Sequence, residues 1–373
     1  MGGMSSLGFG EPRRVVLSVD YELFGNGSGD VRQHMVEPTE RMARLAEQHG
    51  MRLVLFVEVE EYLAFERHAA ELVKVLGYDP ARLIREQVRE LVRRGHDVQL
   101  HLHPEWYGAR WAHGQWHLND TQRTVDSLFD TVAETVAYIA DRKRVLEGMA
   151  GLGPNRRVVA YRAGAFSAQP GSKLLAALAA NGFVLDSSVV KGLVCQGDSD
   201  GYDYRNAPSA RDPWRISADV AVVDAAGPLW EVPIYSVMGR RVQQATWGRL
   251  KAKFSKHVPK TQQKQLIRQL GVGRGPVAAA RFLLQPVPIK LDFHNLSPRA
   301  FLRMITGAPP PADRLPDVLV AIGHCKEHIN DRAFGRLLEL LAREPGLQVV
   351  TFGEVAQLLA DTGGAQSKAR CKM

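Results

Sequence analysis

Short apolar segments alternate with amphipathic segments along almost the whole chain, and this alternation most constrains the fold. The runs RRVVLSVD (13–20) and MRLVLFVEV (51–59) are rich in β-branched residues, which is typical of strands. The stretch between them has Pro38 near its start and Gly50 at its end, as expected of a helix. Strands that alternate with helices form parallel βαβ units with right-handed crossovers. We therefore expect an α/β fold with a parallel sheet.

The same pattern continues towards the C-terminus, where the last helix is expected to end near Ala360. Further strands are expected at HDVQLHLH (96–103), RVVAYRAG (157–164), FVLDSS (183–188), LWEVPIYS (229–236), DVLVAIGH (317–324) and LQVVTF (347–352), with helices that include 119–147 and 331–343.

Polar residues stand at the ends of most of these strands. They are Asp20 and Glu22, Glu58, His101 and His103, Arg162, Asp186, and His324. For any one of them, a solvated loop position is the simpler explanation. Chemistry in barrels and open α/β sheets collects at the carboxyl ends of strands, so six strands with this pattern favour one shared site.

The segment HDVQLHLHPEW (96–106) is the densest group of candidate metal ligands. Side chains alternate between the faces of a strand, so His101 and His103 share one face, whereas His96 takes a structural position. We expect Asp97 to be a surface acid. Two neutral imidazoles suit zinc and similar divalent ions. The competing interpretation is a pair of surface or core histidines.

The segment SVDYE (18–22) adds two carboxylates after the first strand. One of them would complete a set of two histidines and one carboxylate that leaves positions open for water and substrate. The other would serve as a general base. The alternative is a pair of solvated loop acids.

These segments resemble the motifs of the polysaccharide deacetylases, which are built on a partial (β/α) barrel. SVDYE resembles their first motif, with Asp20 as the base and Glu22 as a metal ligand. GHDVQLHLHPE (95–105) resembles their second, with His101 as the first ligand, but Glu105 stands where the family has another histidine. Three readings remain: Glu105 binds the metal, His103 replaces it, or the site is altered. We favour His101 with His103.

The later motifs are matched more loosely. YRAGAF (161–166) resembles the third motif, which implies that Arg162 orients the base. LDSSV (185–189) offers Asp186 for the fourth motif, and VAIGHCKEH (320–328) offers His324 for the fifth. The resemblance implies that His324 is a general acid oriented by Asp186.

The resemblance implies a hydrolase that removes an N- or O-acetyl group from a carbohydrate or glycoconjugate, with Asp20 as general base on metal-bound water. The cofactor is a divalent metal: zinc is the first choice, and cobalt, iron, nickel and manganese are alternatives. The competing functions are an amidohydrolase of a non-sugar amide and a non-catalytic glycan-binding or membrane-associated relative with a decayed metal site.

The expected architecture is a distorted or incomplete (β/α) barrel of about seven parallel strands. It would span 12–361, with a basic helical insertion at 237–290 and flexible termini at 1–11 and 362–373. Aromatic residues crowd one loop after the second motif, and with Glu58 they are candidates for substrate binding: Trp106, Tyr107, Trp111 and Trp116. A small core under the following helix would explain the aromatic residues equally well.

The basic charge of the chain is concentrated in one segment. Twelve of the 48 Lys and Arg residues lie between 232 and 291, and none of the 40 Asp and Glu residues does. A solvated helical face explains this most simply; an anionic membrane surface bound through 240–284 is the alternative, and nucleic acid is disfavoured. Three distant cysteines and the lack of a signal-like apolar run predict a cytoplasmic protein, with peripheral attachment to the inner membrane face as the alternative.

Overall fold

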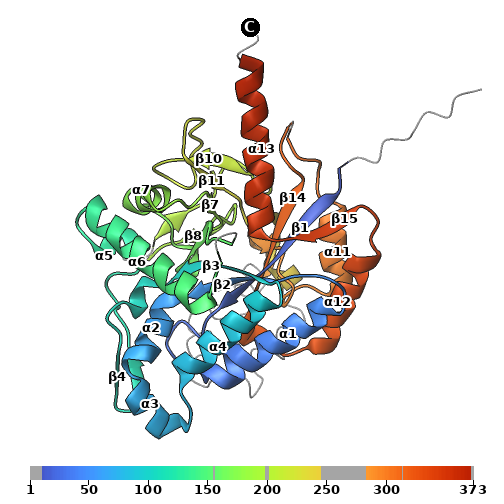
Figure 1. The fold of residues 1–373 in the computed structure, drawn as a ribbon. Coiled ribbons are helices and arrows are strands. Elements are labelled where there is room, and N and C mark those ends of the chain that lie inside the picture. The colour runs from blue at the N-terminus through green and yellow to red at the C-terminus, as the bar shows by residue number, and fades with distance from the viewer. Residues whose placement is uncertain (1–10, 154–155, 198–200, 245–282, 313, 371–373) are drawn as a thin grey trace, which may run out of the picture.

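The computed structural model describes residues 11–153, 156–197, 201–244, 283–312 and 314–370. Within them the expected α/β fold is confirmed: a curled sheet forms a distorted barrel with helices packed around it (Figure 1). The sheet has nine strands, two more than expected, in the order β10-β11-β7-β6-β3-β2-β1-β14, and β15 also pairs with β1. Every pair in it is parallel except β10 with β11.

The strands of this sheet are β1 (Arg13–Tyr21), β2 (Val54–Glu58), β3 (Asp97–Leu102), β6 (Ala160–Ala163), β7 (Leu185–Asp186), β10 (Trp214–Ile216), β11 (Leu229–Glu231), β14 (Val318–His324) and β15 (Leu347–Val350). Three two-stranded hairpins lie outside it: β4 (Arg110–Ala112) with β5 (Gln115–His117), β8 (Val194–Cys195) with β9 (Tyr202–Asp203), and β12 (Ser236–Arg240) with β13 (Pro286–Lys290).

The helices are α1 (Glu37–Glu47), α2 (Val59–Arg67), α3 (Ala69–Leu76), α4 (Pro80–Arg93), α5 (Val125–Leu128), α6 (Val132–Ala150), α7 (Ser172–Ala180), α11 (Pro298–Thr306), α12 (Asp331–Arg343) and α13 (Phe352–Arg370). Short helical turns occur at η1 (Arg32–Val36), η2 (Pro104–Trp106), η3 (Gly164–Phe166), η4 (Arg241–Gln244) and η5 (Cys325–Glu327).

The chain that follows β11 brings the two ends of the curled sheet together. The backbone N–H of Tyr235 donates to the carbonyl oxygen of Val320 in β14 at 3.0 Å. Next to it, the N–H of Ile322 donates to the carbonyl oxygen of Leu291 at 2.9 Å. These bonds satisfy backbone groups on the outer edge of β14, which would otherwise be an unpaired edge.

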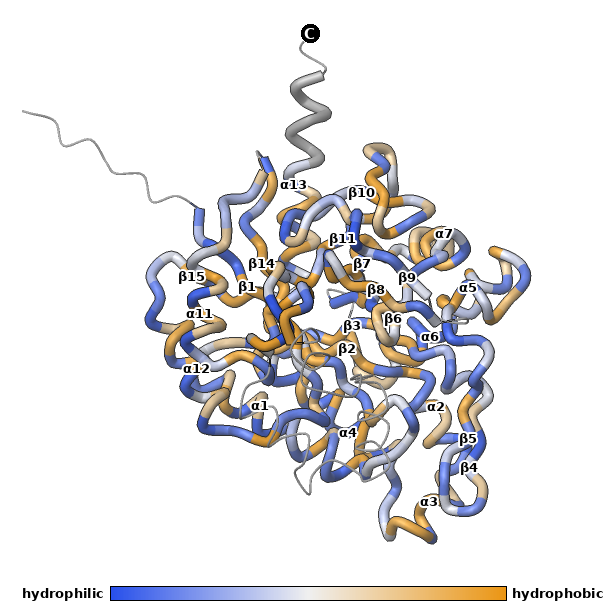
Figure 2. Tube along the Cα trace, turned by 180° about the vertical axis from the view of Figure 1, so that it is seen from behind, coloured by the Kyte–Doolittle hydropathy of each residue, from blue (hydrophilic) through white to orange (hydrophobic). Residues whose placement is uncertain are grey.

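Each main strand contributes to two separate cores. On β2, Val54 and Phe56 point into the barrel, whereas Leu55 and Val57 pack outwards against the helices. Phe352 at the start of α13 enters the barrel interior, with its ring centroid 5.4 Å from that of Phe56. Figure 2 accordingly shows hydrophobic stretches along the central strands and hydrophilic ones at the periphery. The start of α13 thus closes the amino-terminal end of the barrel and leaves the carboxyl end for a site.

Three local expectations were wrong. The segment 119–147 is not one helix, because Thr131 and Glu134 form a capping box that starts α6 separately from α5. Asp97 is not a surface acid: its carboxylate accepts a hydrogen bond from the N–H of Phe352 at 3.1 Å and so holds the start of α13. Helix α13 also continues to Arg370, past the expected end near Ala360.

Most of the predicted basic insertion, residues 245–282, lies outside the described residues, so its helices stay a prediction. The strands that flank it, β12 and β13, pair antiparallel, so the chain leaves and re-enters the fold at one place. Among the described residues, no helix is long and apolar enough to cross a membrane.

Candidate active site

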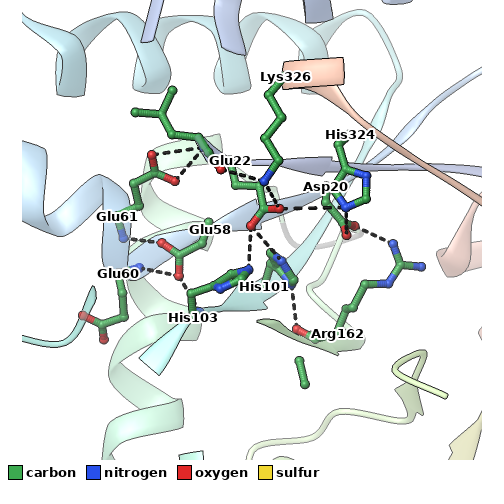
Figure 3. Close-up of polar contacts among 12 residues, drawn as sticks. Asp20, Glu22, Glu58, Glu60, Glu61, His101, His103, Arg162, His324 and Lys326 are labelled. Atoms are coloured by element: carbon green, nitrogen blue, oxygen red, sulfur yellow. Dashed lines mark hydrogen bonds and ion pairs between the residues drawn. The ribbon is translucent and has the colours of Figure 1, made fainter. Parts of the chain in front are cut away.

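Two pairs of neighbouring strands, on either side of β2, deliver polar side chains to the carboxyl end of the barrel. In the strand registers, Asp20 of β1 lies opposite His324 of β14, and His101 of β3 lies opposite Arg162 of β6. Asp20, His101 and Arg162 are almost completely buried. The gathering of strand-end polar residues that the sequence suggested is therefore present in the fold (Figure 3).

Glu22, His101 and His103 form a compact group, which we call the ligand trio. Glu22 Oε2 lies 2.6 Å from His103 Nε2 and 3.4 Å from His101 Nε2. The two imidazole rings are 4.9 Å apart and nearly perpendicular. One potential ligand atom from each residue thus falls within 4.8 Å of the others.

The other nitrogen of each ring fixes how the histidines point. His101 Nδ1 donates to the carbonyl oxygen of Arg162 at 2.8 Å, which turns its buried Nε2 towards Glu22, and this Nε2 has no hydrogen-bond partner within the described chain. His103 Nδ1 donates to Glu105 Oε1 at 2.9 Å. Partners of this kind hold metal-binding histidines in the correct tautomer and orientation. Of the three interpretations of this segment, the geometry favours His103 as a member of the trio, with Glu105 as the hydrogen-bond partner of its other ring nitrogen.

Lys326 is a member of the site that the sequence analysis missed. Its Nζ donates to Glu22 Oε1 and to the carbonyl oxygen of Leu23, both at 2.7 Å. This contact occupies one oxygen of Glu22 and turns the other towards the two histidines (Figure 3). Burial alone would raise the pKa of Glu22, but the charges of Lys326 and His103 hold it well below its usual value. The segment HCKEH drew attention only through its histidines, although a lysine two residues after His324, at the end of a site strand, was a usable signal.

His103 lies between two carboxylates. Burial opposes its charged form, but Glu22 and Glu105 raise the pKa of the ring well above its usual value. The pKa of Glu105 falls because His103 outweighs its burial. With no metal bound, the ring is therefore an imidazolium that bridges Glu22 and Glu105.

Asp20 is held next to the trio by the most deeply buried ion pair of the site. Arg162 Nη1 donates to Asp20 Oδ1 at 2.6 Å, and its remaining donors reach Ser187 and Ser18. Burial would raise the pKa of Asp20, but Arg162 and two histidines bring it below the ordinary value. Asp20 Oδ2 lies 3.5 Å from His324 Nε2. Asp20 is thus ionised, with one oxygen held and the other facing His324.

The structure does not bring Asp186 to His324 as expected. Asp186 accepts hydrogen bonds from Ser188 N and Oγ, and it interacts with the carboxyl of Glu231. Burial raises the pKa of both carboxyls, and that of Glu231 rises further because of Asp186. The acid nearest to His324 Nδ1 is Glu327, with an oxygen at 3.6 Å. Asp186 therefore lies with Ser188 and Glu231 and does not orient His324.

The remaining candidates, which the sequence suggested for substrate binding, lie in different surroundings in the structure. The carboxylate of Glu58 caps α2 and accepts the N–H of His103 at 2.8 Å, so it supports the backbone of the trio instead of facing substrate. Trp106 is buried in the core, and Trp111 and Trp116 are half-buried beside it. Tyr107 is exposed and packs on Phe129 and Tyr138. The small-core explanation therefore applies to Trp106.

The trio suits a divalent metal of the zinc type. Two imidazole nitrogens and one carboxylate oxygen form a common catalytic set with positions left for other ligands. The buried, unpartnered Nε2 of His101 points to a missing partner, because buried polar atoms are normally satisfied. A second possible group, Asp20, Glu22 and His324, shares Glu22 with the trio. Its Asp20 already pairs with Arg162, so we place the ion at the trio.

No family model matches this chain, and no curated protein sequence matches it. Several solved structures resemble it in part, among them the following three. A putative polysaccharide deacetylase from Mycobacterium smegmatis aligns over 94% of this chain and 92% of its own, at 15% identity and a TM-score of 0.45. The Puue allantoinase aligns over 94% of this chain and 91% of its own, at 14% identity and a TM-score of 0.44. The 4-alpha-glucanotransferase from Thermococcus litoralis aligns over 93% of this chain and 40% of its own, at 10% identity and a TM-score of 0.48. Likeness at this level decides neither substrate nor reaction, so function is argued from the side chains.

Proposed function

We propose that this protein is a metal-dependent hydrolase that removes an acetyl group from a carbohydrate. The observation that carries the proposal is the convergence of His101 Nε2 and His103 Nε2 on Glu22 Oε2, next to an ionised, buried Asp20. An ion held by these three residues would polarise an acyl carbonyl and lower the pKa of water.

Asp20 is the general base of the proposed reaction. Arg162 holds Oδ1, so only Oδ2 is available to accept a proton from the attacking water. The ion pair also keeps Asp20 in the charged, proton-accepting form, since its pKa is lowered despite burial. Arg162 therefore both orients and ionises the base.

His324 is the general acid. Burial lowers its tendency to take a proton, but Glu327 and Asp20 outweigh this and raise the pKa of the ring. A protonated imidazole at this place supplies a proton to a departing alkoxide or amine. His324 enters from β14, on the far side of Asp20 from Arg162 (Figure 3).

The direct test is release of acetate by the zinc-loaded protein from acetylated chito-oligosaccharides and xylo-oligosaccharides. N-acetylated amino acids serve as the comparison. Release from a carbohydrate supports the proposal. Release from the amino acids alone would replace it with an amidohydrolase, and release from none of them would overturn it.

Glu105→Gln is expected to weaken zinc binding about 10–100-fold without unfolding the protein. Loss of an outer carboxylate that orients a ligating histidine has effects of this size, and Glu105 is the partner of His103 Nδ1. Competition titration with a chromogenic chelator measures the affinity. Glu66→Gln, on the exposed face of α2, is the matched control and should bind zinc like the unaltered protein. Equal affinities in both variants would remove Glu105 from the site.

A further inference from the structure

A cavity opens at the same end of the barrel as the ligand trio. It has a volume of about 340 Å³ and is enclosed by the loop 23–31, by α2 and α3, and by the β4–β5 hairpin. These walls follow β1, β2 and β3, the strands that carry Asp20, Glu58 and His101 in their last two residues. We call it the indole cavity, after Trp111 and Trp116, which line it.

The indole cavity adjoins the trio through the backbone of the loop 23–31. Leu23, which forms part of its wall, directly follows Glu22. The carbonyl of Leu23 accepts from Lys326, which also holds Glu22, and the N–H of Leu23 donates to Glu61 at 3.0 Å. A ligand in the cavity would therefore contact the loop that directly follows Glu22.

The lining combines aromatic and polar groups. Trp111, Trp116 and Phe65 form an apolar side, and the two indoles lie 5.3 Å apart at 65°. Asn26, Ser28, Asp30 and Gln115 add amide, hydroxyl and carboxylate groups. Flat aromatic surfaces with a few polar groups suit a ligand that has apolar faces and hydroxyl edges.

The charged groups in the lining of the cavity restrict further which class of ligand it can bind. No Lys or Arg of the described chain lines the cavity, so an anionic ligand would have no counter-charge. The one carboxylate, Asp30, accepts hydrogen bonds from Tyr78 Oη at 2.6 Å and from the N–H of Gln33 at 2.9 Å, so a bound cation is not needed to satisfy it. An alkyl chain would desolvate the amides of Asn26 and Gln115 without replacing their hydrogen bonds.

We propose that the indole cavity binds a second, neutral sugar residue of the glycan that carries the acetyl group. The inference rests on the proposed function, and it makes the substrate an oligosaccharide or a longer glycan. A monosaccharide would occupy the trio alone and leave the cavity empty.

The experiment compares the N-acetylglucosamine tetramer with the monomer on the zinc-free protein, so that binding is measured without turnover. Calorimetric titration should show tetramer binding that is about tenfold weaker in Trp111→Ala. Ser28→Leu, which fills the cavity instead of emptying it, should have the same effect. Trp230→Ala removes a half-buried tryptophan of β11 that stacks on Arg215 and does not line the cavity, and it should bind the tetramer normally.

The outcomes separate this inference from the proposed function. Equal tetramer affinity in the unaltered protein, Trp111→Ala and Ser28→Leu would overturn the cavity assignment, even if the zinc-loaded protein releases acetate from sugars. Loss of tetramer binding in both variants, with no acetate released from any carbohydrate, would uphold the sugar site and reject the deacetylase.

Discussion

Asp20→Asn is expected to lower kcat of the zinc-loaded protein about 10²–10⁴-fold, the range for loss of a general base. Asparagine has the shape of aspartate but cannot take the proton through Oδ2, the oxygen that Arg162 leaves available. The measurement is the rate of acetate release at saturating substrate, with the zinc content of the same sample determined in parallel.

The zinc content distinguishes a base from a ligand. The account predicts that Asp20→Asn keeps its zinc, because Asp20 is committed to Arg162 and lies outside the trio. Asp203→Asn, which alters an exposed acid paired with Arg205, is the control and should retain full activity. If Asp20→Asn lost zinc and turnover together, Asp20 would belong among the ligands.

Arg162→Met is expected to destabilise the fold by about 3–5 kcal/mol, the usual cost of breaking one side of a buried ion pair. Methionine removes the hydrogen-bonded partner of Asp20 and leaves that carboxylate buried without its strongest counter-charge. It also removes donors to Ser187, which directly follows the neighbouring β7, and to Ser18 of β1, on the other side of β3 and β2. Urea denaturation of the zinc-free protein measures the change.

The control for this variant is Arg205→Met, which breaks an exposed ion pair with Asp203. Exposed pairs are screened by solvent, so its denaturation midpoint should stay close to that of the unaltered protein. If Arg162→Met were as stable as Arg205→Met, the pair between Arg162 and Asp20 would not hold the site together.

The fold was largely predictable because its signals are local. Apolar β-branched runs mark β1, β2, β3 and β14, and helix α12 begins and ends where the amphipathic pattern placed it. The hairpins β4–β5 and β8–β9 were missed because two- and three-residue strands show no period. The role of Asp97 was misjudged since it depends on α13, which is distant in sequence.

The site was predictable to the extent that strand alternation determines it. His101 and His103 share a face because they are two residues apart, and the strand ends gathered Asp20 and Arg162 beside them. Contacts between distant segments were not predictable: Lys326 reaches Glu22 only because β14 pairs with β1. For the same reason, the partner of Asp186 is Glu231, delivered by β11, and not His324.

The most direct test of the central claim is the zinc content of protein that has been stripped with a chelator, reloaded and dialysed. The account predicts one zinc ion per chain in the unaltered protein and in His117→Ala, which changes an exposed histidine on β5. It predicts no retained zinc in His101→Ala or His103→Ala, since each removes a nitrogen that converges on Glu22. Zinc retained equally in all four proteins, or absent from the unaltered one, would contradict it.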